Sequence, residues 1–292
     1  MDEEVIPSPA PGRIRILMHA CGLNPADWAL CRGLFAGDLP RGIGLEVSGL
    51  VDAVGADVTD ASVGDRVLGT ADYAGCASAG ASDFAIMKYW TRVPAELDLV
   101  DAAALPMAVE TAFRSLDTFG VAADHTLLIH GAGTTIGFAA VQIALMRGAR
   151  VIATAGETFA ERLRAFGATV TSYGDGMVER VLEIAGGEPD LVLDTAPVSG
   201  ALPDLVKIAG GDPRRVFTIS DFAAAAELGV RNSLGEDATL RYDVLPKFAQ
   251  LAAEGRFTVP VAQTFALEDW RAALDTSQSG HAHGKLLLLS AG

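Results

Sequence analysis

The chain has 292 residues, of which 50% are hydrophobic and 20% are charged, a composition that indicates a compact folded protein. This length favours two domains, each large enough for a core of its own. The formal net charge of -15 argues against nucleic acid or an anionic membrane as the main partner. No apolar stretch of about 18 residues predicts a membrane span.

The N-terminal segment and the cysteines point to the compartment. MDEEVIPSPAPG is acidic and has no apolar centre, so we expect no signal peptide. Cys21, Cys31 and Cys76 show no short paired spacing, which fits a reducing cytoplasm better than a disulfide framework. We therefore expect a cytoplasmic protein.

The first hundred residues are predicted to be rich in β-structure. Short apolar or alternating runs occupy residues 13–20, 44–55, 65–70 and 82–87, separated by Gly, Pro and Asp. From about residue 100 helical patterns alternate with the buried strands LLIHG, VIATAG, LVLDTA and VFTIS. This alternation predicts a doubly wound α/β domain with a parallel sheet. The tail returns to strand, helix and strand in VPVAQTF, EDWRAALD and GKLLLLS.

The segment LLIHGAGTTIGFAAVQIALMRG contains the first chemical signal. We predict a buried strand, a tight turn over GAGTTIG and a helix that ends at Gly148. Gly131 and Gly133 permit a pyrophosphate to approach the backbone, and Gly137 permits close packing of helix and strand. The spacing G-x-G-x-x-x-G is one residue longer than the usual dinucleotide fingerprint. Because such turns also occur for packing reasons alone, that alternative stays open.

The next strand bears on which dinucleotide binds. It ends in Thr154-Ala155-Gly156, where an NAD-binding protein would usually offer an acidic side chain to the ribose. Arg162 and Arg164 follow, and a guanidinium can bind a 2'-phosphate. The alternative is that both arginines belong to a solvated helix face. The missing acid together with the two arginines favours NADPH over NADH.

The chain as a whole resembles a known family. The ordered segments CGLNPADW, GLEVSG, VGDRVLG, AAALPMAVETAF, HGAGTTIG, VIATAG, LVLDTA and GKLLLL resemble the medium-chain dehydrogenase/reductase superfamily, in its zinc-independent quinone oxidoreductase branch. The resemblance implies a discontinuous GroES-like substrate domain, residues 1–106 and 245–292, around a Rossmann domain at 107–244. It further implies an active site between the two domains and a homodimer.

The resemblance assigns roles to individual residues. Asn24 matches the family asparagine near nicotinamide and substrate, and is the candidate catalytic residue. Arg162 falls where relatives place a lysine against the 2'-phosphate, Tyr173 matches a tyrosine near the adenosine end, and Lys285 is a weaker match near the cleft. The residues expected to bind the cofactor are Asn24, Thr111, Gly131, Ala132, Gly133, Thr134, Thr135, Ile136, Gly137, Thr154, Arg162, Tyr173, Asp194, Thr195, Ala196 and Lys285.

Relatives usually have small residues or glycine where this chain has Thr134 and Thr135. Their hydroxyls either bond phosphate or cap the helix, and we favour capping for at least one. Candidate walls of an apolar substrate pocket are Trp28, Phe35, Tyr73 and Trp90, each of which is equally well explained as a core residue.

No metal is expected. Zinc-dependent relatives use a cysteine, a histidine in GHE and a third ligand, whereas here Cys21 is present but Leu45 replaces the histidine. Cys21 is then a small packed residue, and Glu46 is expected to bond locally. We expect a structural hydrogen bond from His130, and we expect His281 and His283 to lie in a solvated turn.

Three functional hypotheses follow. The first is a zinc-independent oxidoreductase that transfers hydride from NADPH to a quinone or an activated alkene, an enone or enal, with Asn24 polarising the acceptor oxygen. The second is a tailoring enoyl or ketone reductase. Trp28-Ala29 stands where some enoyl-thioester reductases have a tyrosine, which argues against the thioester version. The third is a non-catalytic NADPH-binding sensor or structural protein.

Relatives usually begin with one more strand before PSPAPGRIRI, whereas six residues precede Pro7 here. Either that strand is truncated or the edge of the substrate domain is rebuilt, and the sequence leaves both alternatives open.

Overall fold

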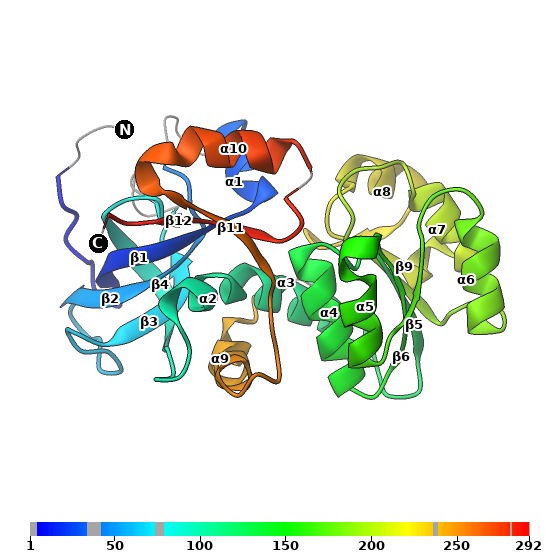
Figure 1. The fold of residues 1–292 in the computed structure, drawn as a ribbon, viewed down its shortest axis with the longest axis horizontal. Coiled ribbons are helices and arrows are strands. Elements are labelled where there is room, and N and C mark those ends of the chain that lie inside the picture. The colour runs from blue at the N-terminus through cyan, green and yellow to red at the C-terminus, as the bar shows by residue number, and fades with distance from the viewer. Residues whose placement is uncertain (1–4, 34–41, 74–78, 236–238, 281, 292) are drawn as a thin grey trace. The chain divides into compact units, whose positions relative to one another are not determined.

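The computed structural model describes residues 5–33, 42–73, 79–235, 239–280 and 282–291. The chain divides into two compact units (Figure 1). Unit 1 comprises Met1–Met107 and Tyr242–Gly292, and unit 2 comprises Ala108–Arg241. Unit 1 is therefore discontinuous in sequence.

Unit 1 is built on a six-stranded sheet in the order β11-β12-β1-β2-β3-β4. Strand β1 also pairs with β4, so β1, β2, β3 and β4 close on themselves as an antiparallel barrel. The C-terminal strand β12 pairs antiparallel with the second half of β1. The strands are β1 (Ile14–Leu23), β2 (Glu46–Val54), β3 (Arg66–Ala71), β4 (Phe84–Arg92), β11 (Val261–Ala266) and β12 (Lys285–Leu289).

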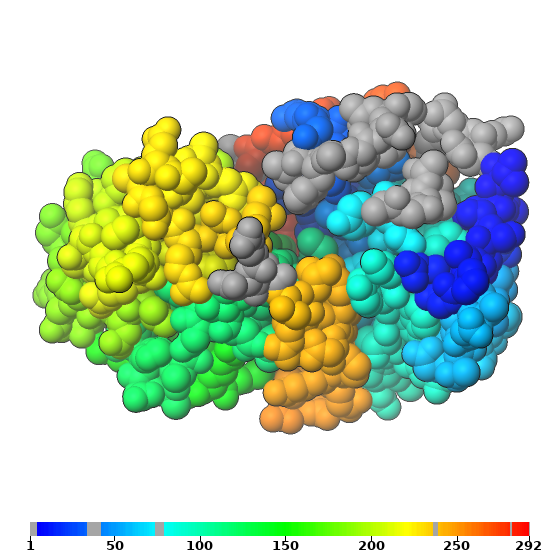
Figure 2. Space-filling model, turned by 180° about the vertical axis from the view of Figure 1, so that it is seen from behind, coloured from blue at the N-terminus to red at the C-terminus, as the bar shows by residue number. Residues whose placement is uncertain are grey.

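The alternation of side chains in β1 explains how this sheet buries its core. Ile14, Ile16 and Met18 face inward and are buried, whereas Leu17 between them is exposed. The N-terminal segment from Val5 lies on the surface (Figure 2). It is held there by a hydrogen bond from the Arg15 guanidinium to the Pro7 carbonyl.

Short helices complete unit 1: α1 (Pro25–Cys31), α2 (Leu99–Ala103), α9 (Leu245–Ala253) and α10 (Trp270–Gln278). Helix α3 (Leu105–Thr118) begins at its boundary and continues into unit 2. Helix α1 starts with proline directly after its N-cap Asn24, a position where the missing amide hydrogen of proline leaves no helical bond unmade.

Unit 2 contains a parallel sheet in the order β10-β9-β8-β5-β6-β7. Helices α4 and α5 contact each other, and so do α6 and α7, with strands of the sheet between the two pairs (Figure 1). The strands are β5 (Thr126–His130), β6 (Arg150–Thr154), β7 (Thr169–Thr171), β8 (Leu191–Asp194), β9 (Val216–Thr218) and β10 (Arg231–Asn232). The helices are α4 (Thr135–Met146), α5 (Glu157–Phe166), α6 (Met177–Ala185), α7 (Leu202–Ile208) and α8 (Phe222–Leu228).

This strand order is that of a doubly wound Rossmann sheet, so the predicted fold class is confirmed. Strands β6 and β7 are added on one side of β5, and β8, β9 and β10 on the other side, so the order of the strands reverses between β5 and β8. Ligands of such sheets bind at the carboxyl ends of the strands beside that reversal. In the part of the chain that the structure describes, no helix combines the length and the apolar character needed to cross a membrane.

Candidate functional site

Unit 2 presents its polar residues at the carboxyl end of β5. Residues 131–137, here called the glycine turn, connect β5 to α4. Gly131 has φ +76°, and a Cβ added there would lie 2.5 Å from the Ala196 nitrogen. A Cβ at Gly137 would lie 2.5 Å from the Gly131 carbonyl oxygen. Both glycines are therefore required by the packing of the turn against its neighbours.

Thr134 caps helix α4. Its hydroxyl accepts a hydrogen bond from the Gly137 amide at 3.0 Å, which satisfies one of the free amides at the start of the helix. The expectation that at least one of the two threonines caps the helix is confirmed.

Thr154, the last residue of β6, contacts the first residue of the glycine turn and the ring of His130. The Thr154 hydroxyl accepts a hydrogen bond from the Gly131 amide at 3.2 Å and lies 2.8 Å from Nδ1 of His130. Burial lowers the pKa of His130 to about 4, so its ring is neutral near pH 7. As expected, His130 acts as a structural hydrogen-bonding residue.

Strand β8 ends beside His130 with a buried carboxyl group. Asp194 accepts hydrogen bonds from the Thr218 hydroxyl at 2.8 Å and from the Ala196 amide at 3.2 Å. Burial raises its pKa to about 6, although these two bonds act in the opposite direction. The neighbouring Thr195 hydroxyl donates to the carbonyl oxygens of His130 and Gly131. Residues from β5, β6 and β8 are thus tied together at one edge of the sheet.

The glycine turn fits a pyrophosphate on two counts. Among the described residues, the amides of Gly133, Thr135 and Ile136 donate to no other protein group. Amides at a helix N-terminus bind anions through their hydrogens and through the helix dipole. A Cβ at Gly133 would touch only the Phe159 ring, at 3.4 Å, so there is space beside the backbone for a ligand. Ala132 at the same turn is buried.

Two residues expected at the adenosine end lie beyond β6. The Tyr173 hydroxyl lies 3.7 Å from the position of a Cβ at Gly156, so this exposed ring is next to the end of the strand. The Arg162 guanidinium carbon lies 4.9 Å from the centroid of the Phe138 ring and remains exposed. Both side chains therefore remain accessible near the site where we expect the adenosine.

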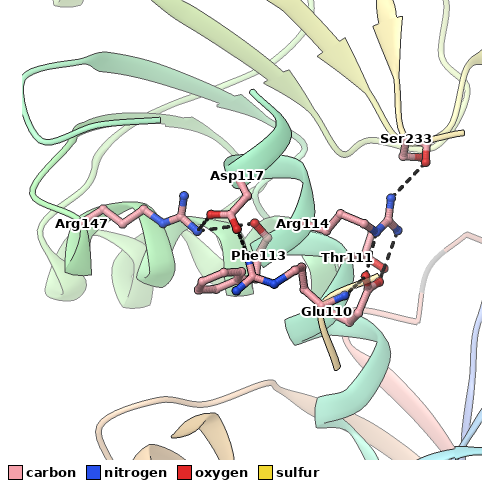
Figure 3. A network of polar contacts seen from close by, with 8 residues as sticks. Glu110, Thr111, Phe113, Arg114, Asp117, Arg147 and Ser233 are labelled. Atoms are coloured by element: carbon pink, nitrogen blue, oxygen red, sulfur yellow. Dashed lines mark hydrogen bonds and ion pairs between the residues drawn. The ribbon is translucent and has the colours of Figure 1, made fainter. Parts of the chain in front are cut away.

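Thr111 lies on α3 inside a polar network that the sequence did not reveal (Figure 3). The neighbouring Glu110 is buried and pairs with Arg114 one turn later, at 2.7 Å. Arg114 also donates to the Ser233 carbonyl at 3.0 Å. This network fixes α3, and with it the buried Thr111, against the chain that follows β10.

The second group of expected site residues lies within unit 1. Asn24 Nδ2 donates to Glu46 Oε1 at 2.9 Å, and Lys285 Nζ donates to Asn24 Oδ1 at 2.7 Å. Lys285 Nζ also lies 2.5 Å from Glu46 Oε1. The other oxygen of Glu46 accepts from the Met107 amide at 2.8 Å. We name Asn24, Glu46 and Lys285 the amide cluster. All three residues are buried.

Asp27 holds the backbone beside the amide cluster, and the sequence analysis did not single it out. Its carboxylate accepts from the amides of Asn24 at 2.8 Å and Gly44 at 2.7 Å. Burial raises the pKa of Asp27 to about 6. The pattern Asn24-x-x-Asp27 at the start of α1 is the capping-box spacing and is the signal that could have revealed it.

Two of the candidate pocket residues pack in or against the core of unit 1. Trp28 is buried in the core of unit 1, and its Nε1 donates to the Ser277 hydroxyl at 3.0 Å. Trp90 packs against the same core, and Tyr73 is exposed. Phe35 lies outside the described residues. The role of these four side chains in a substrate pocket stays a prediction.

Cys21 is packed rather than open to a ligand. A Cβ at Gly44 would lie 2.5 Å from its Sγ, and burial raises the pKa of the Cys21 thiol well above its ordinary value. Among the residues that the structure describes, no group of three or more His, Cys, Asp or Glu side chains could hold a metal ion.

A β-rich unit that is discontinuous in sequence, together with a parallel Rossmann unit, defines a two-domain dehydrogenase architecture, and comparison with known proteins agrees. The family model of the alcohol dehydrogenase GroES-like domain matches residues 10–99, and that of the zinc-binding dehydrogenase domain matches residues 135–218. An alcohol dehydrogenase superfamily protein from Novosphingobium aromaticivorans superposes with a TM-score of 0.84 at 27% identity, covering 99% of this chain and 94% of that one.

Curated relatives narrow the family. The quinone oxidoreductase of Lama guanicoe is 35% identical over 163 residues, which are 54% of this chain and 48% of that protein. The spectinabilin polyketide synthase system protein NorB of Streptomyces orinoci is 37% identical over 199 residues, which are 67% of this chain and 9% of that protein. The chain thus spans about half or less of the length of these relatives. It belongs to the medium-chain dehydrogenase/reductase superfamily of oxidoreductases, as a quinone oxidoreductase-like member.

Proposed function

We propose that the protein is an NADPH-dependent, zinc-independent oxidoreductase that transfers hydride to a quinone or to an activated alkene, an enone or enal. The observation that carries this proposal is the glycine turn, with three backbone amides that donate to no other described protein group and with space beside Gly133. The similarity of the chain to quinone oxidoreductases supports the same proposal. So does Leu45, which stands where zinc-dependent relatives have a ligand histidine.

In this proposal unit 2 holds the cofactor. The amides of the glycine turn bind the pyrophosphate, and Thr154, Asp194, Thr195 and Ala196 maintain the shape of the strand ends beside it. Arg162 binds the 2'-phosphate, and Tyr173 lies beside the adenosine. When bound, the reduced nicotinamide supplies a hydride to the acceptor.

Unit 1 contributes the group that polarises the acceptor. Asn24 donates a hydrogen bond to the acceptor oxygen, where negative charge develops as the hydride adds. The acceptor takes up the hydride, and a solvent proton completes the reduced product while NADP+ is left. Thr111 lies beside the nicotinamide in this proposal, as the family resemblance implies.

A second candidate acceptor class follows from the relatives. Similarity to polyketide synthase proteins over two thirds of the chain favours an enoyl or ketone intermediate of a biosynthetic pathway. Trp28, where some enoyl-thioester reductases have a tyrosine, is buried with its Nε1 bonded, and this argues against the thioester version of that activity.

The experiment that tests the proposal is calorimetry of NADPH and NADH binding, followed on the same sample by NADPH oxidation with 1,2-naphthoquinone, 9,10-phenanthrenequinone and a medium-chain enone. Preferred binding of NADPH together with turnover supports the proposal. NADPH binding without turnover across the panel favours the non-catalytic sensor or structural protein instead, and absence of binding contradicts the assignment of the cofactor.

We also propose a cytoplasmic homodimer, as is common in this superfamily. Sedimentation velocity of the full chain measures the assembly, and a mass of one chain at micromolar concentration would contradict it.

A further inference from the structure

The amide cluster contains two full charges that have no access to water. The Lys285 side chain is 1% exposed and the Glu46 side chain is 0% exposed. Removing an ion pair from water offsets most of its Coulomb attraction, so a buried pair of this kind contributes little net stability. At this position the pair holds the side chain of Asn24, which lies between Lys285 and Glu46.

The two charges permit only one orientation of the Asn24 carboxamide. In the observed orientation Oδ1 faces the Lys285 ammonium at 2.7 Å and Nδ2 faces the Glu46 carboxylate at 2.9 Å. A rotation by half a turn would direct the amide hydrogens at the ammonium and the carbonyl oxygen at the carboxylate. Both contacts would then be repulsive in a site of low dielectric constant.

We propose that Lys285 and Glu46 are positioning residues that present Asn24 to the acceptor as a hydrogen-bond donor. Nδ2 carries two hydrogens, and Glu46 takes one of them. The second donates to no other group among the described residues, and the ammonium on Oδ1 withdraws electron density from the amide and strengthens this donor. This inference rests on the proposed function, because it assigns the acceptor oxygen as the partner of Asn24.

The substrate class follows from the same geometry. A donor fixed in this way favours acceptors that carry a carbonyl oxygen conjugated to the reacting carbon, namely quinones and α,β-unsaturated ketones or aldehydes. An alkene without such an oxygen gives Asn24 nothing to stabilise, and we expect no turnover of it.

The kinetic test compares variants of the pair in the full chain. Lys285→Met with Glu46→Gln removes both charges together and so avoids an unpaired buried carboxylate. The matched control is Asp52→Asn, which breaks the Arg15–Asp52 ion pair of 2.5 Å in the same sheet. We expect kcat with 9,10-phenanthrenequinone to fall about tenfold to a hundredfold in the double variant, with NADPH affinity within about twofold of wild type. The control is expected to keep both values.

Two kinetic outcomes would overturn the proposal. An unchanged kcat in a folded double variant would show that Asn24 needs no positioning. A large loss of NADPH affinity would show that Lys285 contacts the cofactor directly and is not a positioning residue.

Infrared difference spectra give a readout that a purely structural role would not move. The probe is 9,10-phenanthrenequinone bound to the enzyme with NADP+, so no reduction occurs. We expect the carbonyl stretch to lie at lower frequency on the wild type than on the double variant or on Asn24→Leu. Equal frequencies on all three proteins would overturn the assignment of Asn24 as a donor.

If the wild type oxidises no NADPH with any acceptor, the proposed function fails, and the positioning of Asn24 is tested without turnover. The side-chain amide resonances of Asn24 are assigned by their loss in Asn24→Leu. We expect them to be protected from hydrogen exchange in the wild type and to shift and lose protection in the double variant. Resonances that stay unchanged in the double variant would overturn the positioning role.

Discussion

Arg162 is the residue on which the choice between NADPH and NADH depends. Its side chain is exposed on α5, beyond the end of β6, as is that of Arg164 two positions later. We expect Arg162→Gln to lower the affinity for NADPH about tenfold and to leave the affinity for NADH unchanged, since only NADPH carries the 2'-phosphate.

Arg164→Gln is the matched control, because it removes the same charge from the same helix. Calorimetry with both dinucleotides measures the ratio of the two affinities. Equal losses in the two variants would show a diffuse effect of charge and would contradict a specific contact of Arg162.

Substitutions at Gly131 and Gly133 are expected to have different effects, on stability in the first case and on cofactor binding in the second. Gly131→Ala places a side chain at φ +76° and against Ala196, so we expect a loss of about 2 to 3 kcal/mol in unfolding free energy. Gly133→Ala meets only Phe159 at 3.4 Å, so we expect little change in Tm but at least about tenfold weaker NADPH binding. Urea unfolding and calorimetry check the pair. A Gly133→Ala protein that binds NADPH normally would argue against a pyrophosphate at this turn.

His130 and Asp194 are neighbours across β5 and β8, and their ionisations act on stability in opposite directions. Burial lowers the pKa of His130 from 6.5 to about 4, so the unfolded state binds more protons in this range and stability falls as the pH drops through it. Burial raises the pKa of Asp194 from 3.8 to about 6, so the folded state binds more protons and stability rises as the pH drops from about 6 to 4.

We therefore expect His130→Asn to gain stability relative to the wild type as the pH drops from 6.5 to 4, and Asp194→Asn to lose it between about 6 and 4. Urea unfolding across this pH range measures both differences. Parallel curves for a variant and the wild type would contradict the shifted pKa of the replaced residue.

At the residue scale the sequence predicted what is local. The glycine turn and the cap of α4 depend on neighbours within a few positions, and both are found where expected. The contact between Asn24 and Lys285 joins residues 261 positions apart, and no local pattern predicts a fully buried lysine. Glu110 and Arg114 were missed because a helical pair of opposite charges is usually exposed.

At the scale of elements, helix α3 depends on the network in Figure 3. Arg147 and Arg241 lie 4.5 and 4.8 Å from the centroid of the Phe113 ring, and both pair with Asp117. Together with the Glu110–Arg114 pair, these contacts fasten the part of α3 that belongs to unit 2 to the rest of that unit. Strands β7 and β10 were not predicted, because segments of three and two residues show no periodicity.

Arg114→Met tests this attachment. Glu110 would be left buried without its cation, and we expect the unfolding free energy to fall by about 3 kcal/mol. Replacing both residues, Glu110→Gln with Arg114→Met, removes the unpaired charge and should restore part of that loss. Urea unfolding of the two variants decides the matter. A double variant that is no more stable than Arg114→Met would show that the charge of Glu110 is not the cause.

At the scale of the whole molecule, the length of the chain predicted two domains, and the change near residue 100 from short β runs to alternating helices and strands predicted that one of them is doubly wound. All strands of the parallel sheet lie inside unit 2, which is continuous in sequence. We expect residues 108–241 expressed alone to unfold cooperatively in a thermal melt followed by circular dichroism. Residues 1–107 alone lack Leu286 and Leu288 of the unit 1 core and should show no such transition. The reverse result would contradict this division of the chain.

The pairing of β1 with β12 has a consequence for synthesis on the ribosome. Unit 2 ends at residue 241, so all of its residues are synthesised before the C-terminal part of unit 1. Glu46 and Asn24 gain their contact with an ammonium group only when Lys285 has been added. A nascent chain thus passes through a stage in which all residues of unit 2 are present but the amide cluster still lacks Lys285. Under the proposed function, products of termination before Lys285 bind a dinucleotide but lack the ammonium that contacts Asn24.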